Sequence, residues 1–273
     1  MTAPTHRTLE GGGFPVRRPA AMGSLMSPFF LLDEMGPVEW GPREAIGAPD
    51  HPHRGFETVT YLLEGAMQHA DSAGNQGVIN PGDVQWMTAG RGVIHSELPQ
   101  EEFYETGGLT HGFQIWVNLP SKDKMMQPRY QDIPANQIPK ATSEDGKVKA
   151  VVIAGEALGA SAVIDTVIPI QLIHVKMEPN SSFSHSIESD LNVMAYVFGG
   201  SLSIEGKTIE DGQLGILTIG DNINFNSGDN GAEFLLLGGP ELNEPIARYG
   251  PFVMNTREEI HQAITDFQNG TLA

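Results

Sequence analysis

Short runs of alternating hydrophobic and polar residues cover most of this chain, and turn-forming residues separate them. Residues 58–63 (TVTYLL) are β-branched and aromatic, residues 84–88 (VQWMT) follow an Asn-Pro-Gly-Asp turn signal, and residues 109–119 alternate with a period of two. Such alternation is typical of strands that bury one face. Strands at intervals of about eight to twelve residues with turns between them indicate an antiparallel barrel or sandwich. The pattern therefore predicts an all-β protein.

The strand pattern occurs twice along the chain. Residues 59–65 (VTYLLEG) align with residues 194–200 (MAYVFGG), and residues 79–90 (INPGDVQWMTAG) align with residues 209–220 (IEDGQLGILTIG). Similarity within one chain at a nearly constant spacing, here 135 and 130 positions, indicates a repeated structural unit. We therefore predict two similar β-domains in tandem.

The repeat divides the chain into predicted domains of residues 1–134 and 135–273. Residues 120–147, around this boundary, are polar, contain prolines and carry a basic pair at Lys122 and Lys124. Segments of this composition commonly connect domains. We expect this one to be a solvated interdomain connection.

A short helix is predicted near the C-terminus. Thr256 and Glu259 have the spacing of a capping box, so the helix should begin there and continue to about Phe267. Ile260, Ile264 and Phe267 recur at helical spacing. We expect this face to pack against a barrel.

Composition and charge exclude several classes of function. The formal net charge of −18 leaves no excess of Lys and Arg to bind nucleic-acid phosphates directly. The absence of cysteine excludes disulfides, Fe–S clusters, thiolate zinc sites and a cysteine nucleophile. No apolar run approaches the length of a membrane span, and the first residues lack the apolar core of a secretory signal. We expect a cytoplasmic protein without direct contact to nucleic acid or membrane.

Two pairs of candidate metal ligands lie at the ends of residues 51–97. His51 and His53 form one pair, and His95 and Glu97 form the other. Side chains two residues apart share one face of a strand, so two adjacent strands would bring three imidazoles and a carboxylate together. This ligand set suits iron, nickel, manganese, copper or zinc, and not calcium or magnesium.

A simpler reading of the histidines is also open. A single His-x-His pair is often only a surface or packing feature. Pro52 also lacks the N–H that a central strand needs, which favours the start of a strand or an edge strand. Two pairs with the same spacing, joined by strands and turns, favour the metal site.

The internal repeat provides a comparison for these positions. With the spacings given above, the four candidate ligands correspond to Ser186, Glu188, Phe225 and Ser227 in the second domain. His185 is one residue away from such a position, and simple alternation places it on the opposite face of its strand. We expect the second domain to bind no metal.

Two short motifs resemble those of the cupin family. His51-x-His53 followed by Glu57 matches the first cupin motif, and Gly92-Val93-Ile94-His95 matches the second. The chain departs from the general pattern at Gly90, where proline is usual, and at Pro99, where asparagine is usual. The similarity to one subfamily is closer and extends over nearly the whole chain. The runs that resemble the pirin family are HPHRGFETVTYLLEG, PGDVQWMTAGRGVIHSE, QIWVNLP and GPFVMNTREEI.

The resemblance to pirins implies a specific fold and site. It implies a bicupin, two tandem antiparallel cupin β-barrels, with the short C-terminal helix following them. One metal, expected to be Fe²⁺ with Ni, Mn, Cu and Zn as alternatives, would bind in the N-terminal domain only. The resemblance places its ligands at His51, His53, His95 and Glu97, and leaves Glu57 as a residue that supports them.

Some pirins resemble quercetin 2,3-dioxygenases in activity. We therefore predict a non-haem dioxygenase that cleaves a flavonol such as quercetin with O₂, with Glu97 as both ligand and proton acceptor. A flat polyphenol also needs an apolar cavity. The candidate lining residues, whose aromatic members could equally belong to the core, are Phe56, Trp86, Met87, Phe113 and Gln114.

Two alternatives remain open from the sequence. Vertebrate pirins are linked to transcriptional co-regulation, so the chain could be an iron-dependent redox-sensing protein that binds a protein partner and does not turn over a flavonol. The physiological substrate could also be a molecule other than a flavonoid, with quercetin cleavage incidental.

Overall fold

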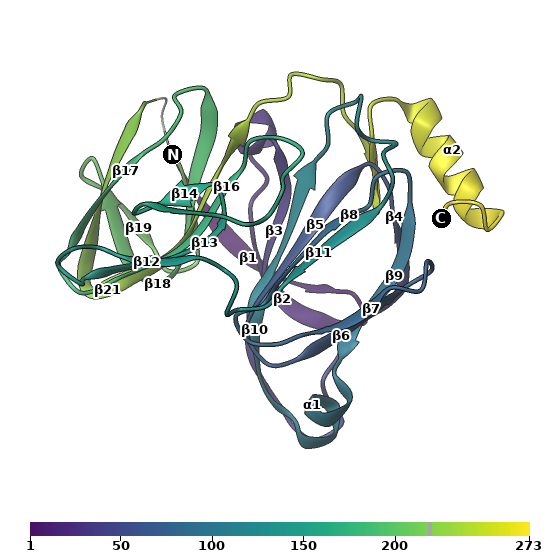
Figure 1. Cartoon of the computed structure of the whole chain (residues 1–273), viewed down its shortest axis with the longest axis horizontal. Helices are drawn as coiled ribbons and strands as arrows, with labels where there is room; N and C mark the ends of the chain where they lie inside the picture. The colour runs from purple at the N-terminus through teal and green to yellow at the C-terminus, as the bar shows by residue number, and fades with distance from the viewer. Residues whose placement is uncertain (218–219) are drawn as a thin grey trace. The chain divides into compact units, whose positions relative to one another are not determined.

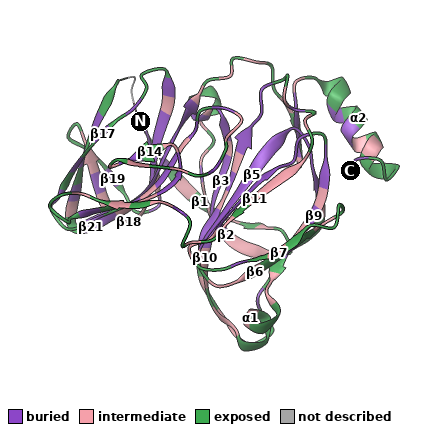
Figure 2. Cartoon of the chain, viewed as in Figure 1, coloured by how far each residue is buried: buried purple, intermediate pink, exposed green. Residues whose placement is uncertain are grey.

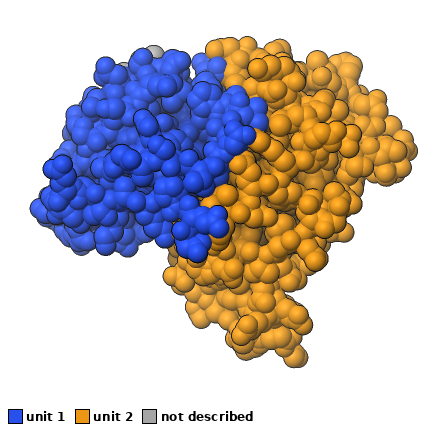
Figure 3. Space-filling model, in the orientation of Figure 1, with its two compact units in different colours: residues 1–6, 19–28, 136–241 blue, residues 7–18, 29–135, 242–273 orange. Residues whose placement is uncertain are grey.

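The computed structural model describes residues 1–217 and 220–273 (Figure 1). Their contacts form two compact units, coloured separately in Figure 3. Unit 1 contains Met1–His6, Pro19–Pro28 and Asn136–Glu241, and unit 2 contains Arg7–Arg18, Phe29–Ala135 and Leu242–Ala273. The expected boundary after residue 134 is one residue from the internal boundary, but both ends of the chain differ from the expectation. The first residues belong to unit 1 because Thr2–Pro4 pair with strand β20 of that unit.

The barrel of unit 2 is built from two antiparallel sheets. The first has the strand order β11 (Arg129–Ile133), β8 (Val84–Thr88), β5 (Phe56–Glu64), β10 (Gly108–Asn118), β3 (Phe29–Trp40) and β2 (Phe14–Pro19). The second has the order β4 (Ala48–His53), β9 (Val93–Pro99), β6 (Met67–Asp71) and β7 (Gln76–Ile79). The hydroxyl of Thr60 on β5 donates to Glu97 on β9. The two sheets therefore face each other, as the layers of a small barrel do.

Residues 120–147, expected to be a solvated linker, instead belong to the two units: those up to Ala135 to unit 2 and those from Asn136 to unit 1. β11 pairs with β8, and β12 (Lys140–Thr142) pairs with β13 (Val148–Ala154). Lys124 is only 1% exposed. Its ammonium group donates to the carbonyls of Gly55 (2.8 Å) and Val253 (2.9 Å) and to Oδ1 of Asn118 (2.6 Å). These three acceptors replace water around the buried charge, which composition alone did not indicate.

Unit 1 is a second β-barrel with an apolar interior. Its main sheet has the order β20 (Gln213–Ile216), β18 (Leu191–Ile204), β21 (Asn222–Pro240), β16 (Gln171–Met177), β13 and β12. β17 (Ser182–Ser186) pairs with β21, β19 (Lys207–Glu210) pairs with β18, and β14 (Glu156–Ala157) pairs with β15 (Ala160–Ser161). The long strands β18 and β21 bend at register shifts between Val197 and Gly199 and between Gly200 and Leu202. Figure 2 shows the buried residues along these strands.

The sequence repeat corresponds to equivalent strand pairs. In unit 2, Tyr61 on β5 lies opposite Val84 on β8. In unit 1, Tyr196 on β18 lies opposite Leu214 on β20. The repeated β-barrels predicted from sequence are therefore confirmed, although residues 218 and 219 at the end of the second copy lie outside the described part of the chain.

The predicted C-terminal helix is present as α2 (Arg257–Gln268). The Glu259 amide donates to Oγ1 of Thr256 (3.1 Å), and the Thr256 amide donates to Oε2 of Glu259 (2.9 Å). The helix belongs to unit 2, where Ile260 and Ala263 pack with β22 (Ala247–Tyr249) and β23 (Phe252–Met254). Phe267 is 40% exposed, so the packing face of the helix includes Ala263 but not Phe267.

The remaining helices are short. α1 (Glu101–Thr106) connects β9 to β10, and a 3₁₀ turn, η1 (Gly23–Met26), precedes β3. β1 (Thr2–Glu10) completes the described strands. Among the residues placed by the structure, no helix combines the length and apolarity needed to cross a membrane.

Candidate metal centre

The two histidine-bearing strands lie side by side in unit 2. β4 pairs antiparallel with β9, with His51 directly opposite His95 and His53 opposite Val93. Residues at alternate positions share a face, so His51, His53 and His95 project from the same side of the sheet. β4 is the edge strand of its sheet, which explains how Pro52 is accommodated without an N–H to donate.

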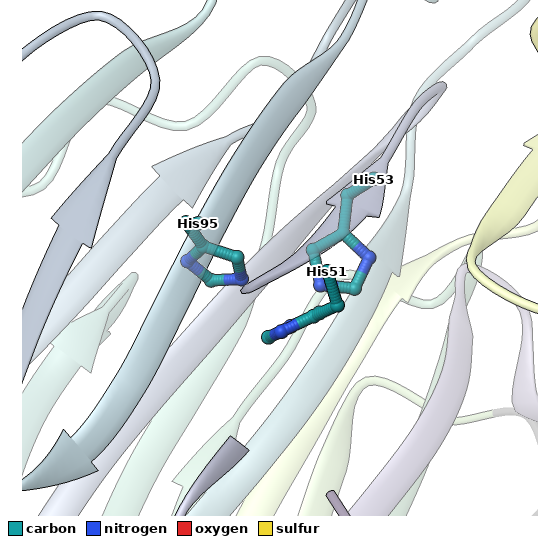
Figure 4. Close-up of side chains that lie close together, drawn as sticks. All are labelled: His51, His53 and His95. Carbon is teal, nitrogen blue, oxygen red and sulfur yellow. The ribbon is translucent and has the colours of Figure 1, made fainter. Parts of the chain in front are cut away.

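The three imidazole rings point towards one another (Figure 4). The ring centroid of His51 lies 4.7 Å from that of His53 and 4.4 Å from that of His95, and the His53–His95 distance is 5.0 Å. One ring nitrogen from each residue can be chosen so that all three lie within 4.8 Å of one another. This spacing suits a single ion that binds imidazole nitrogens at about 2.1 Å after small side-chain adjustments.

The protonation state of the histidines also suits a metal. Burial, together with the neighbouring His95 and His51, holds the pKa of His53 well below its ordinary value. Burial lowers the pKa of His95 to about 4, although Glu97 partly opposes the shift. Both rings are therefore neutral at pH 7, and neutral imidazole is the form that binds metals.

The third ring has a defined tautomer. Nδ1 of His51 lies 2.8 Å from the carbonyl oxygen of Pro49. A carbonyl can only accept a hydrogen bond, so Nδ1 carries the proton and the lone pair is on Nε2. A hydrogen bond from the second ring nitrogen to a carbonyl commonly orients metal-binding histidines.

The ring nitrogens of His53 and His95 have no hydrogen-bond partner of regular geometry among the described residues. The two side chains are 2% and 1% exposed. Buried polar atoms without partners are uncommon and require an explanation. A bound first-row metal ion would explain one nitrogen of each ring, because it would accept the lone pair that no protein donor reaches.

Glu97 lies beside the three histidines and is held by other contacts. The Thr60 hydroxyl lies 2.9 Å from Oε1 of Glu97, and the side-chain amide of Gln114 lies 3.5 Å from Oε2. Glu97 is 7% exposed and lines the same cavity as His51 and His53. Its carboxylate is not one of the ligand groups within 4.8 Å of one another. Its membership of the ligand set stays a prediction.

A cavity of about 450 Å³ opens onto His51 and His53. This volume lies in the usual range of small-molecule sites, about 300–1,000 Å³. Leu31 and Trp116 give it apolar surface. Its charged lining residues are Arg18, Arg248, Glu10, Asp33, Asp50 and Glu97. The site therefore combines metal-binding groups with space for an organic molecule.

The predicted lining residues separate into two groups. Gln114 lines the cavity, whereas Phe56, Trp86, Met87 and Phe113 are completely buried and do not line it. Phe56 instead supports the site, with its ring centroid 5.1 Å from that of His53. The other three belong to the core, the alternative that their residue types had left open.

Sequence reasoning missed Trp116. Its ring centroid lies 5.4 Å from that of His53, and it lines the cavity two residues after Gln114 on β10. Alternation from Gln114 would have indicated it, because Phe113 necessarily projects from the opposite face. The same alternation places Glu57 on the face of β5 opposite to Thr60, where the Thr88 hydroxyl donates to it at 2.6 Å. Glu57 therefore projects from the opposite face to Thr60, and its role in supporting the ligands stays a prediction.

The corresponding region of unit 1 is filled by aromatic rings. The ring centroid of Phe225 lies 5.7 Å from that of Phe183 and 5.1 Å from that of Phe234. His185 is buried on the same face as Phe183, whereas Ser186 is exposed. The comparison made from the repeat was therefore shifted by one residue on β17, and His185 is the inward-facing side chain. Burial lowers its pKa.

Comparison with known proteins now identifies the family. Residues 13–117 match the family model described as Pirin, and residues 172–273 match the model described as Pirin C-terminal cupin domain. The chain belongs to the pirin family. Human pirin is 43% identical to this pirin over 268 residues, covering 95% of this chain and 88% of the human protein.

Two solved structures extend the comparison. The crystal structure of a quercetin 2,3-dioxygenase from Acinetobacter baumannii has a TM-score of 0.95 and 38% identity, covering 100% of this chain and 97% of its own. A bacterial pirin from Escherichia coli, solved in complex with nickel(II), has a TM-score of 0.65 and 20% identity, covering 88% of this chain and 98% of its own. The second similarity establishes the shared fold only. Together they place this chain among the bicupins.

Proposed function

We propose that this pirin is a non-haem metal dioxygenase that cleaves a flavonol such as quercetin with O₂. The observation that carries the proposal is the group of three histidines beside a cavity of about 450 Å³. The similarity to a protein named as a quercetin 2,3-dioxygenase supports the choice of substrate. Iron is the expected metal, and His51, His53 and His95 would hold it, with Glu97 as the fourth ligand.

The metal would provide the redox chemistry of the reaction, by holding an oxygen of the substrate and O₂ together. The protein must then supply a proton acceptor. Glu97 is suited to accept the proton of the flavonol 3-hydroxyl, because its carboxylate lines the cavity next to the histidines. Thr60 and Gln114 contact its two oxygens and would hold the carboxylate at this position.

The proposed reaction needs no reductant other than the flavonol itself. The flavonol C2–C3 and C3–C4 bonds break, and carbon 3 leaves with its own oxygen as CO. One oxygen atom from O₂ bonds to carbon 2 and the other to carbon 4, which gives a ring-opened ester with a carboxylate. The flavonol is oxidised as O₂ is reduced. Glu97 then gives its proton to the carboxylate of the product as the product leaves.

The walls of the cavity would orient the substrate and limit the access of water to it. Trp116 and Leu31 offer flat apolar surface to an aromatic ring. Phe56 packs against both Trp116 and His53, with ring centroids 4.5 Å and 5.1 Å away. A ring bound against Trp116 would therefore lie close to the imidazoles that hold the metal.

The test measures metal content and turnover in the same preparations. The parent protein should contain about one first-row metal ion per chain, consume quercetin under air and release CO. His53→Ala should lose both the metal and the turnover. His185→Ala is the matched control, because His185 is also a buried histidine but lies in unit 1. Iron-loaded parent protein that leaves quercetin and related flavonols unchanged would contradict the proposal.

A further inference from the structure

The charged groups of the metal cavity are unevenly paired. Arg18 and Arg248 both line it. The Arg18 guanidinium contacts the Asp33 carboxylate at 2.5 Å and the Glu10 carboxylate at 2.7 Å. Arg248 makes no ion pair with any residue that the structure describes. The charge of Arg18 is thus neutralised by two carboxylates of the protein, whereas the charge of Arg248 can pair with a bound ligand.

Arg248 lies over the aromatic wall of the metal site. Its guanidinium carbon is 5.1 Å from the ring centroid of Trp116, and the Trp116 ring centroid is 5.4 Å from that of His53. The guanidinium and a metal-binding imidazole therefore contact the same indole. Arg248 is on β22, and the turn that follows, Gly250-Pro251, also lines the cavity.

The stacked position leaves the hydrogen-bond donors of Arg248 free. A guanidinium that lies on an aromatic ring uses its face, while its N–H groups remain able to donate at its edge. Arg248 is exposed as a whole, but partial burial of its side chain and the nearby Arg18 lower its pKa, a cost to the positive charge that Glu10 and Asp33 only partly oppose. An anion from a bound ligand would relieve this cost and satisfy the donors.

We propose that Arg248 is a specificity-determining residue that binds a carboxylate or phenolate group of an aromatic substrate. The other end of the same molecule would present its hydroxyl and keto oxygens to the histidine site. The inference rests on the proposed function and narrows it. The preferred substrate is an anionic planar aromatic molecule, and a neutral flavonol binds less tightly.

The test uses two probes that differ only in the 4′ substituent, 3-hydroxyflavone with an anionic 4′-carboxylate and 3-hydroxyflavone with a neutral 4′-methyl group. Their Kd values are measured by calorimetry with nickel-loaded protein under nitrogen, so that no turnover occurs. The parent should bind the carboxylate about tenfold more tightly, the size expected for a charge-assisted hydrogen bond at a partly exposed site. Arg248→Gln should bring the ratio of the two Kd values to about one, and Arg248→Lys should retain part of the preference.

The control is Arg257→Gln, because Arg257 lines a separate surface groove that Arg248 also borders. This variant should keep the parent ratio. An equal loss of preference in Arg257→Gln would place the anion in that groove and overturn the inference. Equal affinity of the parent for both probes would overturn it too, while the proposed function would stand. If neither probe binds the nickel-loaded parent, the proposed function fails and the inference fails with it.

Discussion

Replacing His95 by leucine should change the stability of the protein in opposite directions without and with metal. His95 is 1% exposed, and neither ring nitrogen has a hydrogen-bond partner of regular geometry among the described residues. A buried polar group without a partner costs about 1–3 kcal/mol. Leucine has a similar size and no polar atom. We therefore expect His95→Leu to be about 2 kcal/mol more stable than the parent when metal is absent.

Metal should reverse this order. A ligand that binds only the folded state stabilises it by about 2.7 kcal/mol at one hundred times its Kd. The parent should gain this amount with nickel(II), because its three histidines lie close enough for one ion. His95→Leu retains two of the three imidazoles and should gain little at the same concentration. The free energies of unfolding of the two proteins should therefore cross as nickel(II) is added.

Urea unfolding followed by tryptophan fluorescence measures this effect. The chain has three tryptophans, Trp40, Trp86 and Trp116, and all lie in unit 2, so the signal reports on the unit that contains the three histidines. Each protein is measured in a chelator and at several nickel(II) concentrations. His185→Leu removes a buried histidine of unit 1 and should respond to nickel(II) as the parent does. A His95→Leu protein that is less stable than the parent in the chelator and gains as much from nickel(II) would show that His95 does not contribute to a metal site.

Three further substitutions test the roles of Glu97, Lys124 and Glu233. Glu97→Gln should keep most of the bound metal but lower kcat for quercetin about 10²–10⁴-fold, since the proton acceptor is lost; an unchanged kcat in stopped-flow assays would exclude this role. Lys124→Met should lower the free energy of unfolding by about 3 kcal/mol, because three acceptors lose their donor, and urea unfolding with no change in midpoint would contradict this. Hydrogen bonds from His174 and Lys176 lower the pKa of Glu233 from 4.5 to about 2, so this carboxylate stabilises unit 1 above pH 4.5 and loses that effect as the pH falls towards 2. Glu233→Gln should therefore be about 2 kcal/mol less stable than the parent at pH 7 and equal to it near pH 2, as followed by circular dichroism; a constant difference would reject the assignment.

The sequence predicted those features that depend on short-range alternation. His51 and His53 share a strand face because side chains alternate. The second pair, His95 and Glu97, indicated the strand that lies beside them, and the structure places His51 opposite His95. The repeated barrel followed from the same kind of pattern, and the equivalent pairs Tyr61–Val84 and Tyr196–Leu214 confirm it.

The features that were missed depend on contacts between distant segments or on the phase of a strand. The exchange of chain ends between the units involves pairing of Thr2–Pro4 with residues more than 200 positions away, which no local pattern reveals. Lys124 looked like a solvated residue because its acceptors, such as Val253, are remote in the sequence. His185 points inward because it lies on the buried face of β17. The sequence does not show which face of this strand is buried, and an alignment shifted by one residue exchanges the inward and outward positions.

Anomalous X-ray diffraction from crystals grown with iron shows whether the three histidines hold a metal ion. Data collected on both sides of the iron absorption edge locate the metal without reference to activity. We expect one strong anomalous peak per chain, within bonding distance of ring nitrogens of His51, His53 and His95. A protein that shows no peak there, or whose iron lies at another position while the three imidazoles contact only water, would contradict the proposed metal site.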